Sequence, residues 1–210
     1  MSSYLFTNNW FEIGARKVWD VLLSQFTPAK ILEVGSYEGA SSCYLIDKLG
    51  QDGALEIHCV DTWGGGVEHQ EGGSFETNMN SVEARFMQNI DSAMCRSPNK
   101  VELVVHKEYS DVALAKLIAE GKKGYFDFVY IDGSHQAPDV LCDAVLGFQL
   151  LKIGGYMVFD DYLWAENLPG GMDPLRCPKP AIDAFLNINC RKLIVLSAPL
   201  YQIYIQKIAD

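Results

Sequence analysis

Aspartates stand at three points where a hydrophobic run of the chain stops, and their positions suggest chemistry. Asp61 follows "LEIHCV", Asp132 follows "FDFVYI", and the pair Asp160 and Asp161 follows "GGYMVF". Such a carboxylate can cap the next helix, hold the hydroxyls of a ribose or bind a cation. A single aspartate is as easily a cap as a ligand group, but four of them at one edge of a sheet favour a functional site.

The elements that must position these aspartates alternate between strand and helix. Apolar runs predict strands at 30–35, 55–61, 101–106, 126–132 and 154–161, and near-continuous runs such as "FVYI" fit a sheet covered on both faces. Helices are predicted at 10–26, 40–50, 81–94, 110–121, 138–151 and 181–187. A closing antiparallel pair is predicted at 192–198 and 201–208.

This alternation predicts an α/β fold of the Rossmann-like, doubly wound type. We expect a mostly parallel seven-stranded sheet with an antiparallel C-terminal hairpin and helices on both faces. Right-handed crossovers bring the carboxyl ends of parallel strands to one edge, where ligands bind. The strand-end aspartates should therefore meet there.

The chain is expected to form one domain over residues 1–210, with an N-terminal helical segment at 1–27. Two Gly-rich or Pro-rich connections, 62–80 and 163–180, are long enough to be active-site loops. Their candidates for lining a pocket are Trp63, His69, Tyr162, Trp164 and Arg176.

The stretch "ILEVGSYEGASS" predicts a strand that turns sharply into a helix. Gly35 permits the turn, and Gly39 lets the backbone approach a ligand. It is not the dinucleotide fingerprint G-x-G-x-x-G, because Ser-Tyr-Glu fills the place of the second glycine. Glu38 would also repel a diphosphate. With Asp61 available for a ribose, the pattern indicates an adenosine-containing ligand without a pyrophosphate.

Composition excludes several classes of partner. The 210 residues carry a net charge of −10, from 17 basic and 27 acidic side chains, so no basic footprint for nucleic acid or an anionic membrane is present. No apolar run is long enough to span a bilayer, and "MSSYLFTNNWFE" is not the pattern of a signal peptide. Scattered cysteines without C-x-x-C predict buried thiols in a reducing, cytoplasmic compartment.

Four motifs in order, "EVGSYEGASS", "CVDTW", "FDFVYIDGSH" and "GGYMVFDDY", resemble those of class I S-adenosylmethionine-dependent methyltransferases. More narrowly, they are similar to the macrocin-type O-methyltransferases that modify antibiotic sugars. The resemblance covers roughly residues 28–208. Tyr37 departs from it, since a glycine is common at this position of the family.

The resemblance implies S-adenosylmethionine as the cofactor and assigns residues to it. The methionine end would lie on Glu33, Gly35, Ser36 and Gly39. Asp61 would bind the ribose hydroxyls with Trp63 beside it, and Ser110 would lie near the adenine. Asp132 would also face the cofactor.

The resemblance further implies that Asp132, Asp160 and Asp161 hold Mg²⁺ or another divalent cation, with His135 as the catalytic base. The residue types agree, because converging carboxylates repel one another unless a cation joins them, and hard oxygen ligands suit Mg²⁺. A metal would lower the pKa of a substrate hydroxyl, and histidine accepts protons near neutral pH. Asp132 would thereby also be catalytic.

The leading hypothesis is thus a metal-assisted O-methyltransferase acting on a small hydroxylated molecule, such as a sugar or a sugar-bearing metabolite. Alternatives are an NAD-dependent oxidoreductase, which the missing fingerprint and the lack of an evident Tyr-x-x-x-Lys disfavour, and a non-catalytic nucleoside-binding or regulatory protein. The acceptor and the oligomeric state stay open. Trp10, Phe11 and Trp19 of the N-terminal helix could cover the sheet or pair with a second copy in a homo-oligomer.

Overall fold

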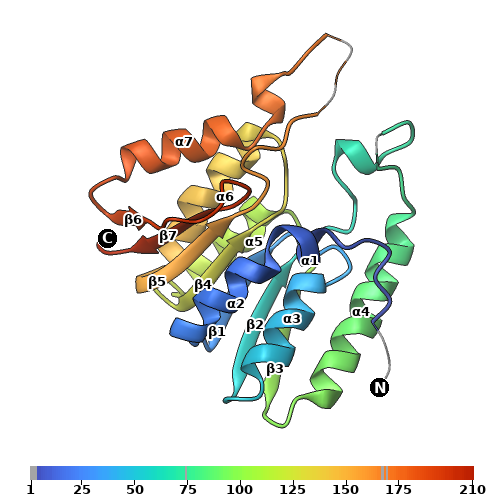
Figure 1. Ribbon diagram of the computed structural model, residues 1–210, viewed down its shortest axis with the longest axis vertical. Coiled ribbons are helices and arrows are strands. Elements are labelled where there is room, and N and C mark those ends of the chain that lie inside the picture. The colour runs from blue at the N-terminus through green and yellow to red at the C-terminus, as the bar shows by residue number, and fades with distance from the viewer. Residues whose placement is uncertain (1–3, 74, 167, 169) are drawn as a thin grey trace.

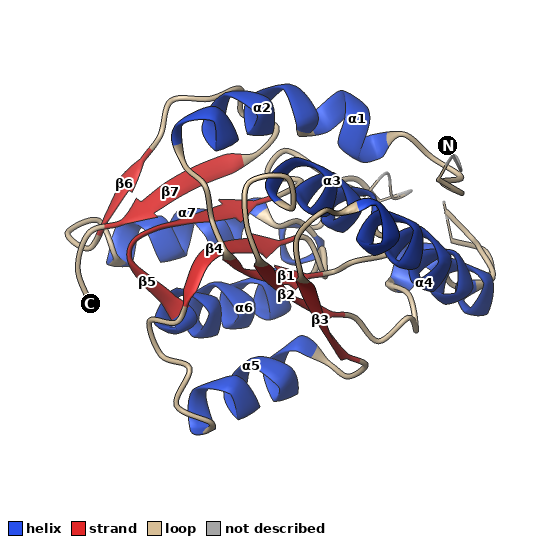
Figure 2. Cartoon of the chain, turned by 90° about the horizontal axis from the view of Figure 1, so that it is seen from below, coloured by secondary structure: helices blue, strands red, loops and turns tan. Residues whose placement is uncertain are grey.

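A computed structural model describes residues 4–73, 75–166, 168 and 170–210, and these form a seven-stranded sheet between two layers of helices (Figures 1 and 2). The strands are β1 (Lys30–Val34), β2 (Leu55–Val60), β3 (Val101–His106), β4 (Phe126–Ile131), β5 (Leu151–Phe159), β6 (Leu193–Val195) and β7 (Ile203–Lys207). Their order across the sheet is β3-β2-β1-β4-β5-β7-β6.

Strands β1 to β5 are parallel, and β7 pairs antiparallel with both β5 and β6. The predicted doubly wound sheet with an antiparallel C-terminal hairpin is therefore confirmed. The direction of winding reverses between β1 and β4, which are neighbours in the sheet but distant in the chain. In open α/β sheets a ligand site forms at such a reversal, outside the carboxyl ends of the strands.

Helices cover both faces of the sheet (Figure 2). One face carries α1 (Trp10–Gly14), α2 (Arg16–Gln25), α3 (Ala40–Leu49) and α4 (Met79–Arg96). The other carries α5 (Ser110–Ala119), α6 (Ala137–Leu150) and α7 (Lys179–Ile188). Short 3-10 turns, η1 (Val67–His69) and η2 (Pro174–Arg176), lie in the two long connections. No helix in the described part of the chain is long and apolar enough to cross a membrane.

The predicted N-terminal helix over 10–26 is in fact two helices that break at Ala15. Gly14, just before the break, lies so close to Tyr201 that an added Cβ would come within 2.7 Å of the tyrosine ring. In α2, Trp19 is fully buried and packs edge-on against Phe128 and Tyr130 of β4, at ring distances of 5.2 and 4.8 Å. This helix therefore covers the sheet of its own chain.

Two element boundaries also differ from expectation. Helix α4 begins at Met79 because the Asn78 side chain accepts the backbone N–H of Asn80 and caps the helix. Strand β5 begins at Leu151, before its two glycines, and a register shift against β4 absorbs the irregularity.

Gly35 fixes how closely the strand ends approach. It has a left-handed φ of +85°, and a Cβ added to it would lie 1.9 Å from the carbonyl oxygen of Asp132. Its N–H donates to Val60 O at 2.9 Å, and the Asp132 N–H donates to Val34 O at 2.8 Å. The turns after β1 and β4 and the end of β2 thus meet through backbone contacts.

We expect Gly35→Ala to lower the free energy of unfolding by about 3 kcal/mol or more, because it adds both a left-handed strain and a backbone clash. Gly53→Ala is the control, since Gly53 has open space around its Cβ position and should change stability by no more than about 0.5 kcal/mol. Urea unfolding followed by tryptophan fluorescence measures both. Equal stability of the two variants would contradict the close approach.

Candidate functional site

A cavity of about 760 Å³ opens at the carboxyl ends of β1, β2, β4 and β5, within the usual size of small-molecule sites. Several of the residues expected at the site line it: Gly35, Ser36, Asp61, Ser110, Asp132, His135, Asp160 and Asp161. Glu33, Gly39 and Trp63 were also expected there, but they are not among the lining residues.

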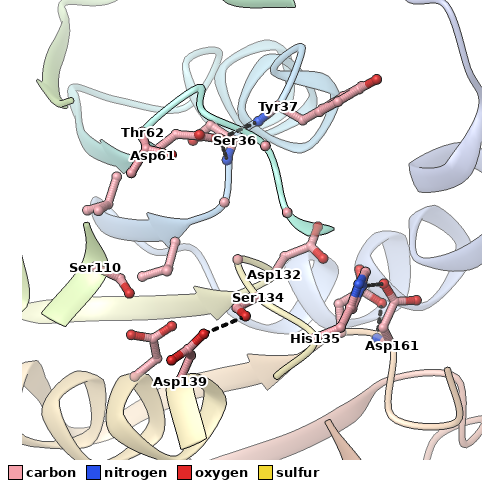
Figure 3. Close-up of a pocket in the computed structure, with 18 of the residues that line it drawn as sticks. Ser36, Tyr37, Asp61, Thr62, Ser110, Asp132, Ser134, His135, Asp139 and Asp161 are labelled. Atoms are coloured by element: carbon pink, nitrogen blue, oxygen red, sulfur yellow. Dashed lines mark hydrogen bonds and ion pairs between the residues drawn. The ribbon is translucent and has the colours of Figure 1, made fainter. Parts of the chain in front are cut away.

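Asp61 ties the two turns at one end of the cavity together (Figure 3). Its Oδ2 accepts the backbone N–H groups of Ser36 and Tyr37 at 2.9 Å each, and its Oδ1 accepts that of Trp63 at 2.7 Å. An ionised carboxylate has about four acceptor positions. Three are used by backbone, so about one remains for a ligand hydroxyl.

Glu33 lies behind the wall of the cavity. It is fully buried, and the hydroxyls of Ser36, Ser41 and Ser42 all donate to its carboxylate, the first at 2.6 Å. Burial raises the pKa of Glu33, while these hydroxyl donors lower it. The side chain therefore joins β1 to the first turn of α3 and holds the glycine turn in place.

Gly39 and Trp63 support the same turn from outside the cavity. Gly39 has a φ of +82°, and an added Cβ would lie 3.0 Å from the Phe86 ring, so it lets α3 pack closely on α4. Trp63 is buried against Phe86 at a ring distance of 4.8 Å, and its indole N–H donates to Tyr37 O at 2.9 Å.

Tyr130 links two of the strand-end carboxylates. Its hydroxyl contacts Asp132 Oδ2 at 3.0 Å and also Asp160 Oδ2. Burial, followed by repulsion from Asp160 and Asp161, raises the pKa of Asp132. Burial and repulsion from Asp161 raise the pKa of Asp160 to about 6. A hydroxyl has one proton to donate, so the arrangement favours a further proton shared between the two carboxyl groups.

His135 and Asp161 form a pair at the other side of the cavity (Figure 3). The distance from His135 Nε2 to Asp161 Oδ2 is 3.0 Å. Asp161 adopts a left-handed φ of +53°, and its N–H donates to Asp160 Oδ1 at 2.7 Å. The imidazole stacks on Trp164, with ring centroids 3.9 Å apart. A carboxylate in this position orients a histidine and stabilises its protonated form.

The expected metal centre is not shown. In the described residues, no three His, Cys, Asp or Glu side chains are grouped so that they could hold a metal ion. Asp132 and Asp160 share the Tyr130 hydroxyl, and Asp161 faces His135. The donor chemistry itself suits a hard divalent cation, and a positive charge would relieve the repulsion between the carboxylates.

Two of the five pocket candidates from the long connections line the cavity. His69 and Trp164 line the cavity, whereas Tyr162 bonds to Asp183 and Arg176 pairs with Glu166. Sequence reasoning missed Tyr130 and Asp143, both of which line the cavity.

Asp61→Ala should lower the free energy of unfolding of the ligand-free protein by about 2–3 kcal/mol, because three backbone N–H groups lose a charged acceptor. Asp61→Asn keeps acceptor oxygen and should cost less. Asp52→Ala, in an exposed turn, is the control and should have little effect. Urea unfolding measures all three, and equal stability of the two alanine variants would refute the bracing role of Asp61.

Known methyltransferases share sequence with this chain. Residues 32–162 match a family model described as a methyltransferase domain. The "Probable caffeoyl-CoA O-methyltransferase 3" of Dictyostelium discoideum is 26% identical over 168 residues, which are 76% of this chain and 57% of that protein. The chain thus spans just over half the length of this curated relative.

Solved structures agree in fold. An O-methyltransferase from Bacillus cereus, in complex with S-adenosylhomocysteine (SAH), has a TM-score of 0.62 at 16% identity, covering 92% of this chain and 80% of that one. TomG from Streptomyces achromogenes, involved in tomaymycin synthesis and solved with S-adenosylmethionine (SAM), has a TM-score of 0.59 at 18% identity, covering 92% and 79%. The matched segment runs from β1 past Asp161 and takes in both ends of the cavity, and by it this chain belongs to the methyltransferase family.

Proposed function

We propose that this protein transfers a methyl group from SAM to a hydroxyl of a small molecule. The observation that carries the proposal is a single cavity with the Asp61-braced glycine turn at one end and the His135–Asp161 pair at the other. Family membership supports methyl transfer, and two proteins of similar fold were solved with SAM or SAH.

In this proposal the cofactor lies along the turns of β1, β2 and β4. The backbone of Gly35 and Ser36 would face its methionine end, and Asp61 would offer its remaining acceptor position to the ribose. Ser110, at the start of α5, would lie toward the adenine. Glu33, Gly39 and Trp63 would act indirectly, by holding the shape of the glycine turn.

The His135–Asp161 pair would serve the acceptor. The acceptor oxygen attacks the sulfonium methyl carbon in line, the C–S bond breaks, and sulfur keeps the electron pair in SAH. His135 takes the hydroxyl proton, and the adjacent Asp161 carboxylate stabilises the resulting imidazolium. Stacking on Trp164 holds the ring in one plane, which favours a fixed geometry of attack.

Aromatic side chains at the mouth support an acceptor with an apolar face, such as a sugar or another ring. Trp10 and Phe75 line the cavity while 42% and 45% exposed, in contact with one another at a ring distance of 5.6 Å. Trp10 also packs on Tyr37 at 5.4 Å. Because the cavity wall is rich in carboxylates, an uncharged or cationic acceptor fits better than an anionic one.

A divalent cation remains part of the proposal as an assistant. Asp132, Asp160 and Asp161 are the residues that would hold it, and when bound it would lower the pKa of the acceptor hydroxyl. The support is their oxygen chemistry and their mutual repulsion, which adds to burial in raising the pKa of Asp132 and Asp160.

Location and assembly stay predictions. The six cysteines are all free, which accords with the expected cytoplasmic setting. Homo-oligomer formation is likewise a prediction, as is the treatment of 1–210 as one domain. The segments that contain η1 and η2 extend beyond the same edge of the sheet, where active-site loops are proposed (Figure 1).

Calorimetric titration should show micromolar binding of SAH and no binding of NADH. His135→Ala should then reduce kcat about 10²–10⁴-fold in an assay of SAH release with a panel of hydroxylated acceptors, while SAH affinity stays within about twofold. Asp161→Asn should reduce kcat by less. Binding of NADH in place of SAH would favour the oxidoreductase alternative, and SAH binding without turnover on any acceptor would favour the regulatory one.

Chelation tests the cation separately. EDTA should abolish turnover and added Mg²⁺ should restore it, and Asp160→Asn should remove the heat of Mg²⁺ binding while leaving SAH affinity nearly intact. Full turnover in EDTA, with no heat for Mg²⁺, would remove the cation from the proposal and leave methyl transfer standing.

A further inference from the structure

Asp143 is a buried carboxyl group on the cavity wall that neither the fold nor the proposed mechanism uses. It lies in α6, is 1% exposed and lines the cavity. Neither Oδ1 nor Oδ2 has a hydrogen-bond partner in the described part of the chain. The Ser110 hydroxyl approaches it and lowers its pKa, but does not reach hydrogen-bond geometry.

Burying such a group lowers the stability of the fold. Burying a polar group without a hydrogen bond destabilises a protein by about 1–3 kcal/mol. The pKa of Asp143 is raised to about 7, chiefly by burial; the Ser110 hydroxyl opposes the rise, and the nearby charges of Asp139 and Asp111 add to it. A buried carboxyl group that faces a cavity and has no hydrogen-bond partner among the described residues is therefore a candidate for hydrogen bonding to a bound ligand.

The position of Asp143 limits which part of a bound ligand it could contact. In Figure 3, Ser110 and Asp139 lie on the side away from His135 and Asp161, and Ser134 lies between the two groups. Asp143 belongs to the side of Asp139, one helical turn beyond that residue, whose Oδ2 already accepts the Ser134 hydroxyl at 2.8 Å. The methyl-transfer chemistry is proposed at the His135–Asp161 pair, whereas the groups that act on Asp143 are Ser110, Asp139 and Asp111.

The chemistry of the Asp143 carboxyl group further limits the kind of ligand group that it could bind. A carboxyl group that is partly protonated near pH 7 can donate one hydrogen bond and accept another. It fits an uncharged group that presents a donor beside an acceptor. The amino edge of adenine is such a group, with the exocyclic amine as donor and a ring nitrogen as acceptor, and asparagine reads the same edge by the same pairing.

We propose that Asp143 binds the amino edge of the cofactor's adenine and determines the base specificity of the site. This inference depends on the proposed function, because it presumes an adenosine cofactor. It adds a specificity-determining residue on α6, whereas Ser110 in α5 is the residue placed near the adenine above. Ligand binding would then supply the hydrogen bonds that Asp143 does not make to any described residue.

The test combines variants of Asp143 with an SAH analogue whose 6-amino group is replaced by hydrogen. Wild-type protein should bind SAH about tenfold or more tightly than the analogue, on the scale of one lost base contact. Asp143→Leu should weaken SAH binding and bring the two affinities within about twofold. Asp143→Asn should keep the preference, because its amide still offers an acceptor beside a donor. Asp91→Asn, on the exposed face of α4, is the matched control for charge.

Thermal unfolding without ligand gives a second readout that also checks folding. Asp143→Leu and Asp143→Asn should raise Tm, by about 2–4 °C per kcal/mol of burial cost removed. Because the folded pKa lies above the unfolded one, ionisation destabilises the folded state progressively from about pH 4 to about pH 7. The gain in Tm should therefore be larger at pH 8 than at pH 5. A structural aspartate would instead lose Tm when substituted.

The outcomes separate the two proposals. If wild-type protein binds SAH but Asp143→Leu keeps the full preference over the analogue, Asp143 does not read the base and only this inference fails. A lowered Tm in both variants, with unchanged preference, leads to the same conclusion. If wild-type protein does not bind SAH at all, the proposed function fails and takes this inference with it.

Discussion

The contact between Gly35 and the backbone carbonyl of Asp132 is the constraint on which the site depends. Strands β1 and β4 are neighbours at the reversal of the sheet, and the turns that follow them would collide if residue 35 had a side chain. Because they do not collide, Asp132 and the glycine turn line one cavity. The turn after β2 joins them through the bonds of Asp61 to Ser36 and Tyr37.

The carboxylates around this edge differ mainly in how their charge is compensated. Asp61 is held by backbone N–H groups, Glu33 by three serine hydroxyls and Asp161 by His135. Asp132 and Asp160 share one tyrosine hydroxyl, and Asp160 also accepts the backbone N–H of Asp161, which is less than two ionised groups require. This difference separates the acids whose charge is compensated within the fold from those that could still bind a ligand, a proton or a cation.

Sequence patterns brought most of the expected residues to the candidate cavity because these patterns are local. A strand that ends in aspartate places that aspartate at the ligand edge whatever the helices do, which is why Asp61, Asp132 and Asp160 all reach the cavity. Glu33 and Trp63 lie next to the same turns yet point behind the wall. Which way a neighbouring side chain points depends on what packs there, here three hydroxyls for Glu33 and Phe86 for Trp63.

The sequence by itself determined the order of strands and helices, the parallel sheet with its C-terminal hairpin and the edge at which acids gather, since periodicity and strand-end residues are properties of the chain. Asp143 shows the limit of what the sequence determines. Helical spacing puts it on the same face of α6 as Val140 and Gly147, so its burial was readable. That no hydrogen-bond partner meets it among the residues the structure describes was decided only by the tertiary structure, because hydrogen bonds depend on distances between segments that spacing along the chain does not fix.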